Sequence, residues 1–166
     1  MRPQDLLVLI KIFFWPYGKW TIYEIAESIF ISKSEVSNAI RRMKKADLFD
    51  SVTNRVKSKN LSNFLINGVK YVFPAVPGKI TNGIPTAYSA PPISKKTIDP
   101  NSPIIVWPYK KSFIKGPQIT PIYKSVPQVA LQDAKLYELF ALIDALRIGK
   151  ARELEIAKEE ISNRLL

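Results

Sequence analysis

Two short helical patterns separated by a tight turn occupy residues 21–45, and both begin with the same start signal. Thr21 is followed three residues later by Glu24, and Ser32 is followed three residues later by Glu35. In each pair the hydroxyl can accept a hydrogen bond from a backbone N–H of the first turn, and the carboxylate can bond the N–H of the capping residue. Two such capping boxes in close succession predict a helix-turn-helix.

Apolar residues repeat at helical spacing in both segments. Four of them fall at i, i+3, i+4 and i+7 in each helix, so they share one face. They are Ile22, Ile25, Ala26 and Ile29 in the first helix, and Val36, Ala39, Ile40 and Met43 in the second. These faces predict two helices packed against each other and against a common core.

The opposite face of the second helix is polar and basic, with short side chains first and long cations after them. This order suits a recognition helix that meets base edges with its N-terminal half and phosphates with its C-terminal half. The residues expected at bases are Ser34, Ser37, Asn38 and Arg41. The residues expected at phosphates are Lys33, Arg42, Lys44, Lys45, Arg55 and Lys57. The alternative interpretation is the solvated face of an ordinary helical hairpin.

The segment ISKSEVSNAIRRMKKADLF resembles the turn, recognition helix and exit of MarR-like winged helix-turn-helix transcription regulators. The matching residues are Ser32, Val36, Ser37, Arg41, Arg42 and Leu48. The resemblance covers residues 5 to 56 and implies DNA binding without naming an operator or an effector. It departs at Asp47, where such proteins usually carry a glycine that can adopt a left-handed conformation.

Further elements are predicted on both sides of this motif. A buried first helix starts near Pro3 and ends at Trp15-Pro16-Tyr17-Gly18. After the recognition helix, Leu48-Phe49 and Arg55-Val56 are expected to pair as two short strands that form a wing. The next elements are a helix over 59–67 capped by Ser58, a left-handed stop at Gly68, and a strand over 69–73.

The composition changes at Pro74, because eleven of the thirteen prolines lie between Pro74 and Pro127. Proline interrupts helices, so this stretch is expected to contain little or no long helix. Its large apolar residues, such as Trp107 and Phe113, are uncommon in disordered segments. The sequence therefore predicts an extended and mostly ordered arm with a few short strands.

Two helices are predicted after the arm. Asp133 caps the first, which runs from Ala134 to Ile148 and stops at Gly149; the second follows from Ala151. The helical pair either closes the domain or forms a dimer interface. The predicted fold is therefore mainly α: a winged helix-turn-helix domain over 1–73, the Pro-rich basic arm over 74–128, and the helical pair over 129–166.

Charge and composition limit the functions that the chain can have. The net charge is +11, and the arm alone holds seven lysines and one acidic residue. Such a basic chain suits a polyanion, with nucleic acid first. The chain has no cysteine and no histidine, which removes Ser-His-Asp and Cys-His catalysis and the common zinc sites. We expect no enzyme activity, no metal or other cofactor, and no membrane span, and we expect a cytoplasmic setting.

The main hypothesis from the sequence is a sequence-specific double-stranded DNA-binding protein, a transcriptional regulator that acts as a homodimer. The alternative is a protein–protein interaction module, such as an antitoxin-like protein that binds a toxin through the arm and the C-terminal helices. A pocket for a small effector between the arm and the helices stays open as a third hypothesis.

Overall fold

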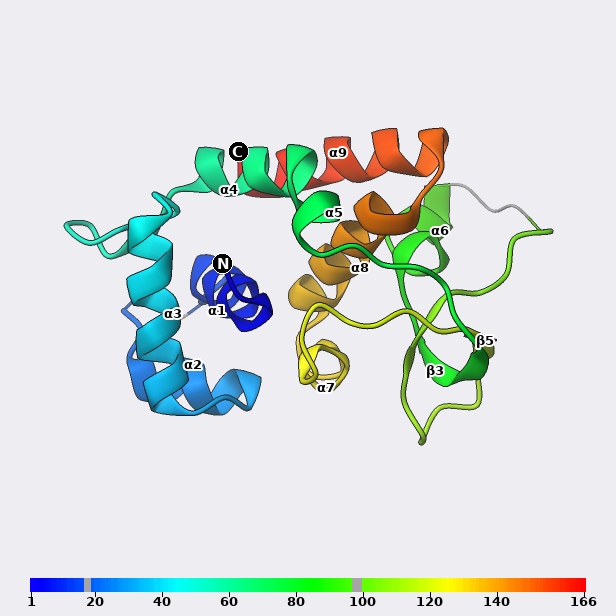
Figure 1. Ribbon diagram of the computed structural model, residues 1–166, viewed down its shortest axis with the longest axis horizontal. Helices are drawn as coiled ribbons and strands as arrows, with labels where there is room; N and C mark the ends of the chain where they lie inside the picture. Colours follow the sequence, from blue (N-terminus) through cyan, green and yellow to red (C-terminus); the bar gives the residue numbers. More distant parts are fainter. Residues whose placement is uncertain (17–18, 97–99) are drawn as a thin grey trace.

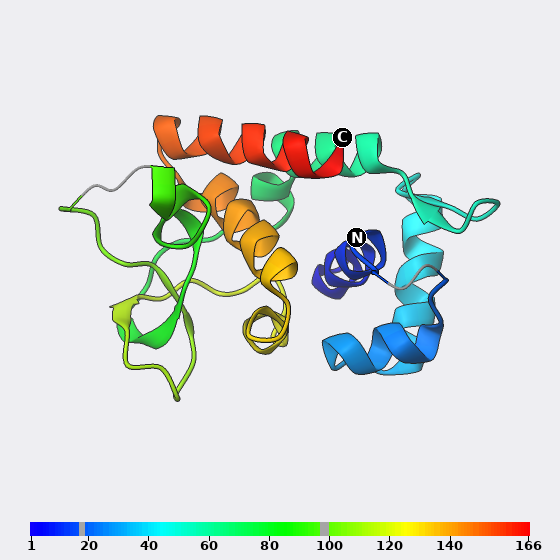
Figure 2. The ribbon, with the colours of Figure 1, turned by 180° about the vertical axis from the view of Figure 1, so that it is seen from behind.

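The computed structural model describes residues 1–16, 19–96 and 100–166. Over these residues the chain is mainly helical, as predicted, with two small antiparallel sheets. Figure 1 shows α3 (Lys33–Lys45) at one end of the molecule and the sheet around β3 (Ile80–Pro85) at the other end. In Figure 2, the view from behind, α4 (Ser58–Asn67) and α9 (Ala151–Leu165) lie side by side along one edge.

Three helices form the N-terminal part: α1 (Pro3–Phe13) and α2 (Ile22–Ile29) pack against each other and against α3. As predicted, α1 is enclosed, and all of its residues 5–12 are buried. Ile22 is 38% exposed, so the buried face of α2 is narrower than expected. Tyr17 and Gly18, which belong to the predicted end of the first helix, lie outside the described residues.

A two-stranded antiparallel hairpin follows α3. It pairs β1 (Phe49–Asp50) with β2 (Arg55–Val56), so the predicted first strand is displaced by one residue. The helix predicted over 59–67 is α4, which begins one residue earlier, at Ser58. The predicted cap at Ser58 is wrong, because Lys57 occupies the N-cap position and no side chain caps this helix.

The strand predicted over 69–73 is wrong, because the chain forms a short helix there, α5 (Val69–Val72). The predicted left-handed stop at Gly68 is wrong as well. Gly68 has φ −118° and ψ −33°, a right-handed conformation that lets the chain continue as helix. Val69 is buried, and α5 packs on α8 (Ala134–Ile148). Among the described residues, no strand pairs with this segment. Packing against α8 therefore determined its structure, and the alternating pattern did not.

Over its described part, the Pro-rich segment contains three short strands in the order β4-β3-β5. β3 is the central strand. β4 (Val106–Pro108) pairs antiparallel with its second half, and β5 (Lys115–Pro117) pairs antiparallel with its first half. Short helical turns complete the segment: η1 (Ala87–Ser89), α6 (Ile93–Lys96) and α7 (Val126–Ala130). Its short strands and the absence of a long helix from its described residues agree with the prediction, and its description as an ordered arm stays a prediction.

Gly116 allows the closest approach in this segment. A Cβ atom built on it would lie 1.6 Å from the carbonyl oxygen of Ile104, a distance that no side chain can have. The backbone that precedes β4 therefore passes directly over β5 only because residue 116 is glycine.

The C-terminal helical pair has the predicted boundaries. The Asp133 carboxylate accepts a hydrogen bond from the N–H of Leu136 (3.2 Å) and caps α8. α8 is the most enclosed helix of this pair, and its residues 139–146 are all buried. α9 packs on α8 and α4, and its Ile161 and Leu165 are buried there. The apolar side of α9 is thus covered within the chain.

A buried polar cluster around Asp144 of α8 links the Pro-rich segment to the helices. We call Thr86, Trp107, Asp144 and Arg147 the Asp144 cluster. Asp144 Oδ2 accepts hydrogen bonds from Thr86 Oγ1 (2.8 Å) and Trp107 Nε1 (2.5 Å). Asp144 Oδ1 accepts from Arg147 Nη1 (2.5 Å), and Arg147 Nε donates to the carbonyl oxygen of Phe73 (2.7 Å). Burial raises the pKa of the Asp144 carboxyl, and the neighbouring Arg147 opposes that rise.

Buried apolar residues from α1 to α9 join in a contiguous core, which includes Trp107 and Ile119 of the Pro-rich segment. All three predicted parts of the chain contribute to it. The boundaries proposed for them at residues 73 and 128 stay a prediction.

Candidate nucleic-acid interface

The helix starts around the predicted recognition helix form as the sequence indicates, with one exception. At α2 the capping box is complete: Glu24 N donates to Thr21 Oγ1 (3.2 Å), and Thr21 N donates to Glu24 Oε2 (2.9 Å). At α3 only half of it forms, because Ser32 Oγ accepts from Glu35 N (3.2 Å) while the Glu35 carboxylate points elsewhere. The predicted second capping box is therefore wrong.

The Glu35 carboxylate belongs to an ion-pair cluster that joins α3 to α1. We call Asp5, Glu35 and Arg42 the Arg42 cluster. Arg42 donates to both carboxylate oxygens of Asp5 (2.6–3.0 Å) and to Glu35 Oε1 (2.6 Å). Gln4 Nε2 also donates to Glu35 Oε1 (3.0 Å). Asp5 is fully buried, so this cluster links α3 to α1 through a carboxylate inside the protein.

The charges of this cluster stabilise one another. The hydrogen bonds that Arg42 donates to Asp5, and then to Glu35, raise the pKa of its guanidinium, and the hydrogen bonds that Arg42 and Gln4 donate to Glu35 lower the pKa of Glu35. Arg42 thus faces α1 and keeps only a quarter of its side chain exposed. In the free protein the Arg42 guanidinium is therefore engaged by a buried carboxylate on the facing helix, and its contact with a phosphate stays a prediction.

The opposite face of α3 is exposed, and it carries the predicted base-contacting residues. Ser34, Ser37 and Arg41 are exposed, and Asn38 is half-buried. Arg41 Nη2 donates to Asn38 Oδ1 (2.9 Å), so these two side chains form one polar unit on the surface. Val36, Ala39, Ile40 and Met43 lie on the inner side and are buried.

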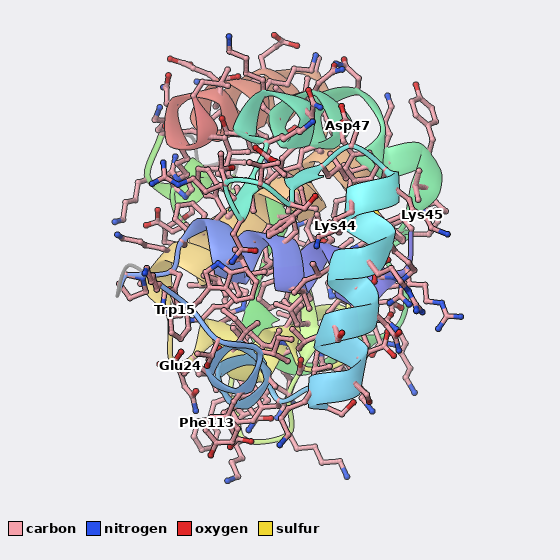
Figure 3. All side chains as sticks on the ribbon, turned by 90° about the vertical axis from the view of Figure 1, so that its left-hand side faces the viewer. Trp15, Glu24, Lys44, Lys45, Asp47 and Phe113 are labelled. Atoms are coloured by element: carbon pink, nitrogen blue, oxygen red, sulfur yellow. The ribbon has the colours of Figure 1, made fainter. Side chains whose placement is uncertain are left out.

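Lysine side chains flank the exposed face of α3. Lys33 lies at the start of α3 with its ammonium 5.7 Å from the centre of the Tyr23 ring, and Lys44 lies at the other end, 5.9 Å from the centre of the Phe49 ring. In Figure 3 α3 stands in front of the rest of the molecule, with Lys44 and Lys45 labelled on either side of its last turn. These ammonium groups are exposed, so they can reach a polyanion placed against α3.

The hairpin extends this surface beyond the end of α3. Its turn is held by Asp50, whose carboxylate accepts from Val52 N (2.9 Å) and Thr53 Oγ1 (2.7 Å); these bonds lower its pKa. Val52 at the tip is 94% exposed, and Arg55 is exposed at the start of β2. Figure 1 shows the hairpin projecting from the same end of the molecule as α3.

The chain leaves α3 through Asp47, which has φ 57° and is therefore left-handed. An aspartate thus stands in the conformation that favours glycine, and its carboxylate accepts bonds from Asn60 Nδ2 (3.0 Å) and from the Lys57 ammonium. The Lys57 bond lowers the pKa of Asp47 and raises the pKa of Lys57. Lys57, a predicted phosphate contact, is therefore engaged by an aspartate in the free protein.

No protein-family model, no curated protein and no solved structure matches this chain. The surface around α3 is therefore interpreted from its own geometry.

Clusters of metal-binding side chains and membrane-spanning helices are both absent from the described part of the chain. It contains no group of three or more His, Cys, Asp or Glu side chains placed to hold a metal ion. None of its helices is long and apolar enough to cross a membrane.

The sequence did not reveal the role of Asp5. Its position in the first turn of the first helix indicates only a favourable interaction with the helix dipole, whereas it is the buried partner of Arg42. The available signal was an acid in a helix that is otherwise apolar nearly all round. Its partner lies 37 residues away, and no local pattern names it.

Proposed function

We propose that this protein is a sequence-specific double-stranded DNA-binding protein, a transcriptional regulator of the winged helix-turn-helix kind. The observation that carries the proposal is the division of α3 into two faces. One face carries the buried apolar residues of α3, with the Arg42 cluster at its edge, and the other presents short polar side chains and then cations to solvent. A helix packed on its apolar face, with its polar face outward, is suited to entering a major groove.

Ser34, Ser37, Asn38 and Arg41 are the proposed base contacts. An asparagine can bond adenine bidentately, and an arginine can bond guanine in the same manner. Because Arg41 and Asn38 already share a hydrogen bond, they are expected to read neighbouring bases as a unit. The hairpin would act as the wing, with Arg55 towards a phosphate or the minor groove.

Lys33, Lys44, Lys45 and Arg55 are the proposed phosphate contacts. Arg42 stays a predicted phosphate contact, although its guanidinium is engaged by Asp5 in the free protein. Lys57 would reach a phosphate only by leaving Asp47. A single unit of this size reads few base pairs, so we propose that two copies bind a palindrome.

The first experiment selects binding sites from randomised duplexes with the full chain. It then measures affinity by fluorescence anisotropy for the selected duplex and for a scrambled one. Arg41→Ala is expected to reduce the preference for the selected duplex by about 1–3 kcal/mol. The matched control is Arg152→Ala, an exposed arginine on α9.

A second arm measures the salt dependence. Lys45→Ala is expected to weaken both duplexes alike and to reduce the slope of log K against log salt by about 0.9, the value for one phosphate contact. Lys135→Ala, an exposed lysine on α8, should leave the slope unchanged. If selection yields no preferred sequence, or if the Arg41 variant keeps the full preference, α3 does not read bases and the proposal fails.

A further inference from the structure

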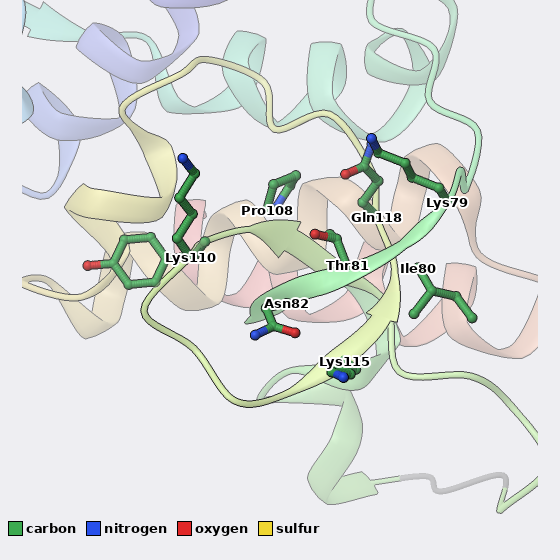
Figure 4. A pocket seen from close by; sticks show the side chains of 9 residues that line it. Lys79, Ile80, Thr81, Asn82, Pro108, Lys110, Lys115 and Gln118 are labelled. Atoms are coloured by element: carbon green, nitrogen blue, oxygen red, sulfur yellow. The ribbon is translucent and has the colours of Figure 1, made fainter.

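A second basic surface lies on the three-stranded sheet, at the end of the molecule opposite α3 (Figures 1 and 2). It is an open groove of about 710 Å³ over β3 and the chain on either side of it. Polar side chains dominate its lining: Lys79, Thr81, Asn82, Lys110, Lys115 and Gln118. In the close view of Figure 4, Lys79 and Lys110 stand at the two sides of the groove, with Thr81 and Gln118 between them.

The charge of this groove is not neutralised within the described part of the chain. Lys79, Lys110 and Lys115 are exposed, and none of them forms an ion pair with a described residue. Lys111 adds a fourth exposed ammonium on the connection between β4 and β5. Cations gathered around amide and hydroxyl groups suit phosphodiester oxygens.

One aromatic side chain lines the groove, and a second lies outside its lining on the connection that carries Lys110 and Lys111. Phe113, on the connection between β4 and β5, is 97% exposed, and the half-buried Tyr109 lines the groove. The connection is fastened to the central strand: Tyr109 N donates to the carbonyl oxygen of Asn82 (3.0 Å), and Ser112 Oγ donates to that of Gly83 (2.7 Å). After Phe113, the carbonyl oxygen of Ile114 accepts from Gly83 N (2.9 Å), so Phe113 is presented to solvent by a connection that is anchored on both sides of it.

We propose that this groove binds single-stranded nucleic acid. Lys79, Lys110 and Lys115 would follow the phosphates, and Phe113 and Tyr109 would stack on bases. A sheet surface that combines a basic groove with aromatic side chains matches what unpaired bases need, since every base has a face for stacking. A duplex hides those faces, so the aromatic side chains favour the single strand. This site is independent of the proposed reading of DNA by α3.

The test uses the full chain and fluorescein-labelled 12-nucleotide oligo(dT) and oligo(U), followed by anisotropy. Phe113→Ala is expected to weaken binding about tenfold, the effect of losing one stacked base. Because Phe113 is almost fully exposed, this variant should keep the fold. Tyr71→Ala, which removes a 74% exposed aromatic on α5, is the matched control and should bind like the original chain.

The charge is tested with the triple variant Lys79→Gln, Lys110→Gln and Lys115→Gln. It is expected to reduce the slope of log K against log salt by about 2, given about 0.7 for each phosphate contact of a single strand. The control replaces three exposed lysines away from the groove, Lys59, Lys124 and Lys135, by glutamine. The double variant Arg41→Ala and Lys45→Ala on α3 compares the two surfaces, and it should weaken oligonucleotide binding much less than the triple groove variant does.

Several outcomes would overturn the proposal. Unchanged oligonucleotide binding by both groove variants would remove the groove from any role in it, and loss of binding in the α3 variant would assign it to α3. Equal loss for a 12-base-pair duplex and for oligo(dT) would mean a general polyanion surface. If the groove variants lose binding to phosphatidylglycerol vesicles but not to either oligonucleotide, the groove serves a membrane surface instead.

Discussion

The N-terminal helices and the Pro-rich segment reach their ordered structures in different ways. α2 and α3 start with caps made by residues three positions apart, and their apolar faces follow helical spacing. The Pro-rich segment has short strands, and its order depends on partners far away in the chain. Thr86 and Asp144 are 58 residues apart, and Trp107 and Asp144 are 37 apart. Local sequence signals indicate where α2 and α3 begin, whereas a buried cluster on a distant helix stabilises the Pro-rich segment.

The two proposed binding surfaces differ in the same way, one formed by neighbouring residues and the other by distant ones. α3 carries its polar face on a regular helix, so the spacing of residues alone indicated which side chains lie together. The groove on the sheet combines Lys79, Lys110 and Lys115 from three separate places in the chain. The pairing of β3 with both β4 and β5 brings these ammonium groups to one surface.

The largest expected effect tests the Asp144 cluster. Asp144→Ala leaves the buried Arg147 without its carboxylate, and removing one partner of a buried pair costs about 3–5 kcal/mol. The free energy of unfolding is measured with urea. Hydrogen exchange should show the greatest loss of protection in residues 80–117. Glu155→Ala, which breaks an exposed pair with Lys158, is the control and should cost less than about 1 kcal/mol.

If α1, α2 and α3 lose as much protection as the sheet does in the Asp144 variant, the two regions unfold together and the contrast between them fails.

A smaller effect is expected from the cluster that holds α3. Asp5→Ala removes a fully buried carboxylate that bonds Arg42 and the N–H of Arg2 (2.7 Å), which should cost about 2–3 kcal/mol. Duplex affinity should fall as well, because α3 then loses this link to α1. Glu27→Ala, an exposed acid on α2, should change neither quantity. Unchanged duplex affinity in a destabilised Asp5 variant would show that the cluster does not orient the reading face.

The next effect concerns a local signal alone. Thr21→Ala removes the side-chain acceptor at the start of α2, and loss of such a cap costs about 1 kcal/mol. Thr21→Ser keeps the hydroxyl and should retain most of the stability. Thermal unfolding of the three chains gives the comparison. Equal unfolding temperatures for the alanine variant and the original chain would show that tertiary packing alone determines where α2 begins.

The smallest effect is a pH dependence. Hydrogen bonds from Arg42 and Gln4 lower the pKa of Glu35 in the folded chain below its usual 4.5. The folded state therefore binds fewer protons than the unfolded state near that pH. The stability from Glu35 is complete above pH 4.5 and is lost as the pH falls. Since the side chain is a quarter exposed, the contribution should stay below about 1 kcal/mol.

Urea unfolding at about pH 7 and about pH 3.5 measures this contribution. Glu35→Gln should lose less stability on acidification than the original chain does. An identical loss in both chains would mean that other carboxylates account for the acid sensitivity.

Local patterns in the sequence were enough to predict much of the fold. They gave α1, α2, α3, α8 and α9, and they indicated the hairpin after α3 and the absence of a long helix in the Pro-rich segment. They also placed Ser34, Ser37, Asn38 and Arg41 on one outward face. Each of these features follows from the spacing, caps and backbone limits of neighbouring residues, which act over one or two helical turns.

Tertiary structure decided the features that depend on distant partners. It turned Arg42 towards Asp5, drew the Glu35 carboxylate away from its expected cap, and packed residues 69–72 on α8 as helix. It also buried Asp144 beneath Thr86 and Trp107. A charged group in a low-dielectric interior must find an opposite charge or a hydrogen-bond donor. The sequence lists the candidate partners, but only the packing of the whole chain determines which of them come within reach.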